Sequence, residues 1–101
     1  DTVAEGLEAV TEVGAAHRLP VFAGDVNAVA RGAIAALGFN YYDLGRQTGE
    51  VVVRVLAGAD PGDIPVQGVQ RTELYLNPDA ALAMGVTIPP ALLERAKVVI
   101  E

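Results

Sequence analysis

The stretch Pro20-Val21-Phe22-Ala23-Gly24-Asp25, followed by an apolar run over residues 33–39, decides the fold class. The apolar residues before Gly24 predict a short buried strand, and residues 33–39 predict a second strand that is covered on both faces. Gly24 and Asp25 form the turn after the first strand, and one or two turns of helix are expected over residues 26–31. Buried strands that alternate with helices are typical of a layered α/β fold.

Two longer helices flank these strands. Residues 2–18 predict a helix whose first turn Thr2 caps, because Thr2 and Glu5 stand at capping-box spacing. Residues 42–57 predict the clearest helix of the chain, capped by Asn40 and closed by Gly58. The apolar side of this second helix carries Leu44, Thr48, Val51, Val52, Val55 and Leu56.

The remainder predicts shorter elements. Residues 59–68 read as a loop, and residues 70–76 alternate as a strand at an edge of the sheet does. Short helices are expected from Asn77-Pro78 and from Pro89-Pro90, with a tail or final strand over residues 97–101. The predicted fold class is therefore α/β, with three to four strands and flanking helices.

The amino-acid composition and net charge exclude several classes of function. The 101 residues carry a formal net charge of −6 and no basic stripe, so nucleic acid is not an expected partner. The chain has no cysteine and a single histidine, His17, which excludes thiol catalysis, thiolate metal sites and multi-histidine metal sites. No glycine-rich phosphate loop occurs, so no cofactor is expected. No nucleophile–base set is visible, so the protein is not expected to be an enzyme.

Asp25 is the first candidate for ligand binding. Open α/β sheets bind ligands beyond the carboxyl ends of their strands, and Asp25 follows a predicted strand. Its carboxylate would accept a charge-assisted hydrogen bond from a ligand's ammonium group. The alternative is an ordinary turn residue after glycine.

Aromatic residues supply the second set of candidates. Phe39, Tyr41 and Tyr42 offer faces for stacking on an aromatic ligand, or they pack where a strand meets a helix. Packing is the better interpretation of Phe39. Asn40 is a candidate hinge residue as well as a cap.

Three blocks of the sequence resemble one family. They are Pro20 to Asp25, Gly38 to Gly49 and Asn77 to Pro89, the last followed by a matching tail over residues 96–101. Together they resemble the substrate-binding proteins of ABC importers, which are type I periplasmic binding proteins, in the branch whose characterised members bind aromatic amino acids. The likeness covers nearly the whole chain and corresponds to roughly the last third of the family's proteins, without the export signal.

The resemblance implies part of a flavodoxin-like, three-layer lobe. The family has two lobes with the ligand between them, so the chain is expected to be a single partial domain. Residues 1–40 would belong to the second lobe, 41–67 to a first-lobe helix and crossover, and 68–101 to a C-terminal return segment. Asp1 and Thr2 look like the end of a ligand-contacting loop, although capping already explains Thr2.

The resemblance also implies the function. It indicates a solute-binding component that takes an amino-acid-like molecule and delivers it to an ABC permease. The expected location is periplasmic or extracellular, with lipid anchoring possible in that family. The alternative is the effector-binding core of a LacI-type transcription regulator, which shares this lobe plan but would carry a DNA-binding head.

The apolar side of the 42–57 helix has a further consequence. It should lie on a sheet that these residues do not contain, and each exposed Val or Leu would forgo about 1.5–3 kcal/mol of burial. We therefore expect the isolated chain to repack this helix or to pair with a second copy, as a homodimer or a domain-swapped oligomer. Ligand binding by these residues alone is expected to be weak.

Overall fold

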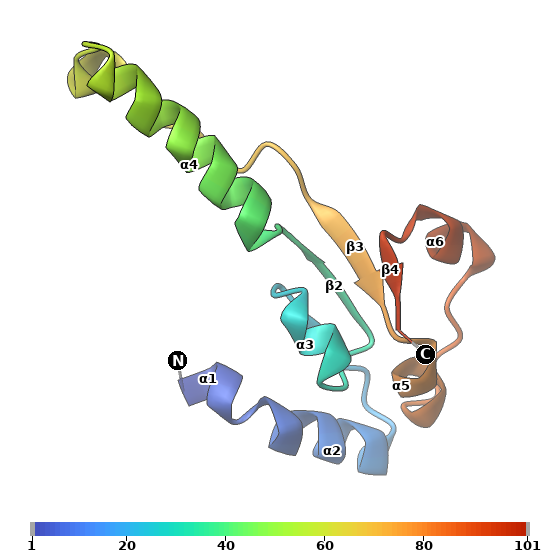
Figure 1. Ribbon diagram of the computed structural model, residues 1–101. Coiled ribbons are helices and arrows are strands. Elements are labelled where there is room, and N and C mark those ends of the chain that lie inside the picture. Colours follow the sequence, from blue (N-terminus) through green and yellow to red (C-terminus); the bar gives the residue numbers. More distant parts are fainter. Residues whose placement is uncertain (1, 101) are drawn as a thin grey trace. The chain divides into compact units, whose positions relative to one another are not determined.

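The computed structural model describes residues 2–100, which form two compact units. One unit comprises the described residues up to 38 together with those from 73 onward, and it holds the sheet. The other unit comprises residues 39–72 and holds the longest helix (Figure 1). The assignment of these segments to two lobes stays a prediction.

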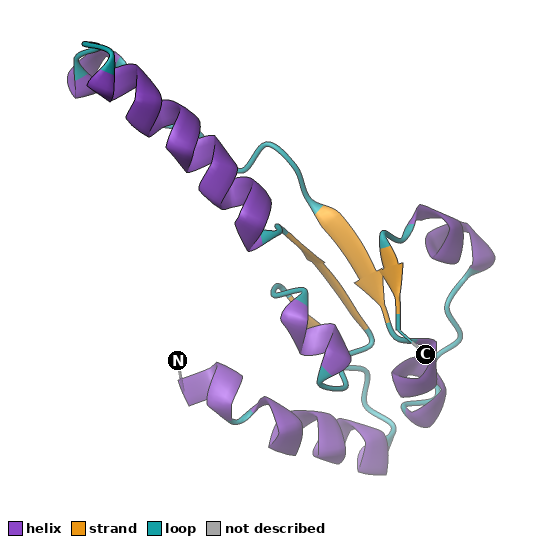
Figure 2. Ribbon diagram, in the orientation of Figure 1, coloured by secondary structure: helices purple, strands orange, loops and turns teal. Residues whose placement is uncertain are grey.

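The first unit is built around a four-stranded sheet (Figure 2). β1 (Phe22–Ala23) pairs in parallel with β2 (Ala35–Gly38), and β2 pairs antiparallel with β3 (Glu73–Leu76). β3 also pairs in parallel with β4 (Val98–Val99). The predicted α/β class is confirmed. The expectation that residues 70–76 form an edge strand is wrong, because β3 has a bonded strand on each side.

The helix predicted over residues 2–18 is in fact two helices. α1 (Thr2–Glu5) is separated from α2 (Leu7–His17) at Gly6. Glycine is costly inside a helix because it loses more backbone entropy than other residues, so the break falls there. Thr2 is the first residue of α1 itself, and the predicted capping by Thr2 is therefore not what the structure has.

One face of the sheet is covered by α3 (Asn27–Ala30), which is one turn long where one or two turns were predicted over residues 26–31. Val26 and Val29 pack against Ala36 and are almost completely buried. Partly buried residues complete this cluster: Ala23, Tyr75 and Ile100. Ala23, Ala36 and Tyr75 are cross-strand neighbours, so the cluster spans three strands.

A second cluster joins α2 to the first of the two C-terminal helices. Ile34, Ala81 and Met84 are buried together, with Ala15 of α2 packed against them. Ala81 lies on α5 (Pro78–Ala83), which Asn77 caps. The two short helices predicted near the C-terminus are α5 and α6, which spans Pro90–Arg95.

The opposite face of the sheet is open at β1 and β2. Phe22 is 65% exposed and Leu37 is 63% exposed, so the predictions of a buried first strand and of a second strand covered on both faces are wrong. The physical reason is the alternation of strand side chains. Ala36 and Gly38 are buried, whereas the intervening Leu37 points away from α3.

The second unit consists of α4 (Tyr41–Leu56) and the segment that follows it. None of the residues of α4 is buried, and Val53 and Leu56 are 65% and 82% exposed. The following segment covers part of the helix, because the side-chain amide of Gln47 donates to the Gly68 carbonyl at 2.9 Å. Pairing of the remaining apolar side with a second copy stays a prediction.

We predict that Asn77 stabilises the first unit through two separable bonds. Its Oδ1 accepts from the Ala80 N–H at 2.9 Å, and its Nδ2 donates to the Val29 carbonyl at 3.1 Å. Asn77→Asp keeps the cap and loses the donor, which should cost about 1 kcal/mol. Asn77→Ala loses both and should cost about 2 kcal/mol in urea unfolding. An unchanged stability of Asn77→Asp would show that the bond to Val29 contributes nothing, and equal losses for the two variants would show that the cap contributes nothing.

Candidate functional site

The first unit contains a recess between α1, α2, β1 and α3, with a volume of about 380 Å³. Most of its wall is apolar. Among residues 2–100, the charged side chains on that wall are those of Asp25 and Arg31. The other lining residues are Val3, Ala4, Leu7, Val10, Val21, Phe22, Ala23, Gly24 and Ala28. An apolar hollow with a few charged groups is the ordinary form of a small-molecule site.

Asp25 follows β1, as predicted, and its side chain is exposed. Its Oδ1 accepts two hydrogen bonds from Asn27, one from the backbone N–H and one from Nδ2, each at 3.0 Å. This is an Asx turn that starts α3, so the interpretation of Asp25 as a turn residue is correct. The other oxygen, Oδ2, accepts no hydrogen bond from residues 2–100, and it remains available to a ligand.

Gly38 lets the carboxyl end of β2 lie close to the turn after β1. A Cβ on Gly38 would lie 2.6 Å from the Gly24 carbonyl oxygen and 3.2 Å from Cγ1 of Val26. No side chain fits in that space. Gly38 therefore lets the end of β2 approach the turn that carries Asp25.

Arg31 connects α3 to both N-terminal helices. Its Nε and Nη2 donate to the two carboxylate oxygens of Glu8, each at 2.6 Å. Nη2 also donates to the Ala4 carbonyl at 2.6 Å. Thr11 adds a bond from α2 to the same region, because its hydroxyl donates to the Arg31 carbonyl at 3.2 Å. Two-point contact between guanidinium and carboxylate is the strongest form of such a pair.

This ion pair changes the acidity of its members. The hydrogen bond from Arg31 lowers the pKa of the Glu8 carboxyl from its ordinary 4.5 to about 2. The hydrogen bond to Glu8 raises the pKa of the Arg31 guanidinium, and the negative charge of Asp25 raises it further. Both groups are therefore charged at neutral pH, and Arg31 and Asp25 interact electrostatically at the recess.

The other predicted site residues lie elsewhere. Asn40 caps α4, because its Oδ1 accepts from the Tyr42 N–H at 2.8 Å. Tyr41 starts that helix and meets Phe39 edge to face, with ring centroids 5.1 Å apart. These residues belong to the 39–72 unit, so their joint action with Asp25 stays a prediction. Thr2 is exposed on α1 and does not line the recess, and Asp1 lies outside the described residues.

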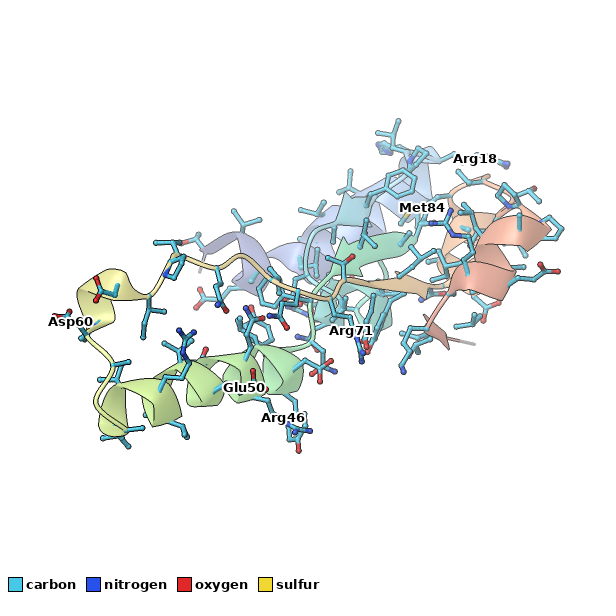
Figure 3. All side chains as sticks on the ribbon, turned by 90° about the horizontal axis from the view of Figure 1, so that it is seen from above. Arg18, Arg46, Glu50, Asp60, Arg71 and Met84 are labelled. Carbon is cyan, nitrogen blue, oxygen red and sulfur yellow. The ribbon has the colours of Figure 1, made fainter. Side chains whose placement is uncertain are left out.

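The 39–72 unit has hollows of its own along α4. An apolar one of about 310 Å³ lies between the helix and residues 61–67. A polar one of about 410 Å³ is lined by charged groups of both signs, among them Arg46, Glu50 and Arg71, which Figure 3 labels. Neither hollow combines an apolar wall with a carboxylate that follows a strand. The recess beside Asp25 has both features, so it is the better candidate for a ligand site.

Two further classes of site find no support in residues 2–100. No three His, Asp or Glu side chains of this part of the chain gather closely enough to hold a metal ion. None of its helices is both long and apolar enough to cross a membrane.

Sequence reasoning missed Arg31 and Glu8. They stand 23 residues apart, Glu8 on α2 and Arg31 directly after α3, and no local pattern signals such a pair. The weak signal was composition: Arg31 is a charged residue directly after the largely apolar stretch of α3.

Comparison with known proteins connects this geometry to one family. The family model described as ABC transporter substrate binding protein matches residues 1–100. The tyrosine-binding protein of Clostridioides difficile (strain R20291) is 33% identical over 82 residues, which are 81% of this chain and 24% of that protein.

Two solved structures resemble the chain over almost its whole length. A conserved domain protein of Vibrio cholerae (O1 biovar El Tor) is 40% identical, with a TM-score of 0.85 over 98% of this chain and 33% of its own. An ABC domain from Streptococcus pneumonia, solved in complex with L-Trp, is 32% identical, with a TM-score of 0.81 over 99% of this chain and 35% of its own. The chain thus spans about a quarter to a third of the length of these relatives.

We predict that Gly38→Ala destabilises the first unit. The added methyl group would overlap the Gly24 carbonyl, and such overpacking costs about 1–3 kcal/mol. The matched control is Gly45→Ala on α4, where a Cβ meets no atom within 4 Å. That change should be neutral or stabilising by up to about 1 kcal/mol, because alanine favours helix. Urea unfolding checks both, and an unchanged Gly38→Ala variant would contradict the close contact.

We also predict that the contribution of Glu8 to stability depends on pH. Its pKa is about 2 in the folded chain and 4.5 ordinarily, so its ionised form stabilises the fold above pH 4.5. That contribution is lost as the pH falls from about 4.5 towards 2. The difference in unfolding free energy between the unmodified chain and Glu8→Gln should therefore be larger at pH 7 than at pH 3. A difference that is the same at both values would refute the role of the charge.

Proposed function

Because the chain belongs to the family of ABC transporter substrate binding proteins, we propose that the protein holds an amino-acid-like solute between two lobes and delivers it to an ABC permease. The proposal includes a periplasmic or extracellular location and a lipid anchor. The family match over residues 1–100 favours this function over the LacI-type regulator. In this role the protein binds and releases its ligand without chemical change.

The observation that carries the proposal is Oδ2 of Asp25, which lies beside an apolar recess and accepts no hydrogen bond from residues 2–100. A free amino acid brings an ammonium group, which is a strong donor to a carboxylate. Asp25 is already fixed by its turn, because Oδ1 is bonded twice to Asn27. The oxygen offered to the ligand is therefore pre-oriented, which reduces the entropy lost on binding.

The recess also suits the side chain of such a ligand. Its volume of about 380 Å³ lies at the lower end of the usual range for ligand sites, about 300–1,000 Å³. Leu7, Val10 and Phe22 give it walls that favour a branched or aromatic side chain. The L-Trp complex of one structural relative and the name of the tyrosine-binding relative support the same class.

The remaining predicted residues complete the proposed site. Tyr41 is 61% exposed and presents a ring whose orientation Phe39 fixes by edge-to-face contact. We propose that this ring stacks on the ligand, that Asn40 acts in the hinge, and that Asp1 and Thr2 contact the ligand's polar head. We also propose that residues 1–40 belong to the second lobe and residues 41–67 to a first-lobe helix and crossover. Residues 68–101 would then form the C-terminal return segment.

Calorimetric titration of the natural polypeptide that carries this sequence tests the role of Asp25. L-Trp, L-Tyr and L-Leu are the ligands, and indole-3-propionate is a Trp analogue without the ammonium group. Asp25→Asn keeps the turn but loses the charge, so it should weaken L-Trp binding at least about tenfold. It should leave the weaker binding of indole-3-propionate almost unchanged.

Glu94→Gln on α6 is the matched control, since it removes one exposed carboxylate far along the chain from the recess. It should bind L-Trp as the unmodified protein does. Equal affinities of Asp25→Asn and the unmodified protein for L-Trp would remove Asp25 from the site. Absence of binding to every amino acid would overturn the ligand class.

A further inference from the structure

α1 is a helix whose position depends on contacts with other segments. Its four residues, Thr2–Glu5, are all exposed, and Val3 is 76% exposed. A helix of this length is not stable in water by itself. Gly6 separates α1 from α2, so the two segments do not form one continuous helix.

Arg31 provides a contact of this kind. Its Nη2 donates at 2.6 Å to the carbonyl of Ala4, in the last turn of α1, where carbonyl groups have no partner within the helix. The same nitrogen donates to Oε2 of Glu8 in the first turn of α2. One guanidinium group therefore ties together the two helix ends on either side of Gly6.

The group that makes these bonds also belongs to the recess. Val3, Ala4 and Arg31 line it together with Asp25. A displacement of α1 would therefore change the shape of the wall that a ligand meets. The guanidinium is held on Glu8 by two bonds, so its own position is well defined.

We propose that Arg31 is a positioning residue for ligand binding, which fixes α1 through the Ala4 carbonyl and so sets the wall of the recess beside Asp25. This inference rests on the proposed function. The Arg31 side chain then has two roles. Its ion pair with Glu8 stabilises the packing of α2 on α3, and its bond to the Ala4 carbonyl shapes the site. The two roles are separable, because a carboxylate at position 31 can pair with a cation but cannot donate to a carbonyl.

The experiment compares three variants of the natural polypeptide by L-Trp titration, urea unfolding and hydrogen exchange of the Gly6 amide, whose N–H donates to the Thr2 carbonyl at 3.1 Å and so reports on α1. Arg31→Gln should bind L-Trp about tenfold more weakly and exchange this amide about tenfold faster. The double variant Glu8→Arg with Arg31→Glu restores an ion pair of reversed direction. Its stability should recover towards that of the unmodified protein, while its affinity and the exchange rate of its Gly6 amide should not. Arg95→Gln, on exposed α6, is the control and should change none of the three measurements.

Two results would overturn the proposal. Unchanged exchange of the Gly6 amide in Arg31→Gln would show that Arg31 does not fix α1. Recovery of affinity together with stability in the double variant would show that the ion pair, and not the Ala4 bond, is what binding requires. If the unmodified protein binds no amino acid, the proposed function fails, and the exchange rates alone then decide whether Arg31 holds α1.

Discussion

The burial of Val26 and Val29 against Ala36 is the interaction on which the first unit depends. It fixes the single turn of α3 on the sheet, and that turn then reaches three other segments. The Val29 carbonyl accepts from Asn77, and Arg31 bonds to the N-terminal helices. A short helix with little stability of its own thus becomes the point where distant parts of the chain meet.

The same turn places the candidate site. Its first residues give Asp25 a fixed orientation through Asn27, and its end gives Arg31 its reach to Glu8. A carboxylate and a guanidinium therefore stand at one apolar recess without neutralising each other in a direct bond. Glu8 holds the guanidinium by Nε and Nη2, and Oδ2 of Asp25 accepts no hydrogen bond from residues 2–100.

Much apolar surface remains uncovered in residues 2–100. The open face of the sheet exposes Phe22 and Leu37, and α4 exposes Val53 and Leu56. Exposed aliphatic and aromatic groups at this density usually mark surfaces that meet other protein. The relatives are three to four times longer than the matched region, and in that setting such faces are expected to be interior.

The sequence by itself determined the elements whose signals are local. The long helix was predicted within one residue at each end, because Asn40 caps it and Gly58 adopts the positive φ that follows its last turn. The α/β class and the turn at Asp25 also follow from neighbouring residues. Only the tertiary structure decided which strand faces are covered, as at Leu37, and where Arg31 finds Glu8 and Ala4. The Arg31 contacts join residues 23 and 27 positions apart, and the covered face of β2 is selected by packing on α3; neither the contact energies nor the covering element is encoded in local periodicity.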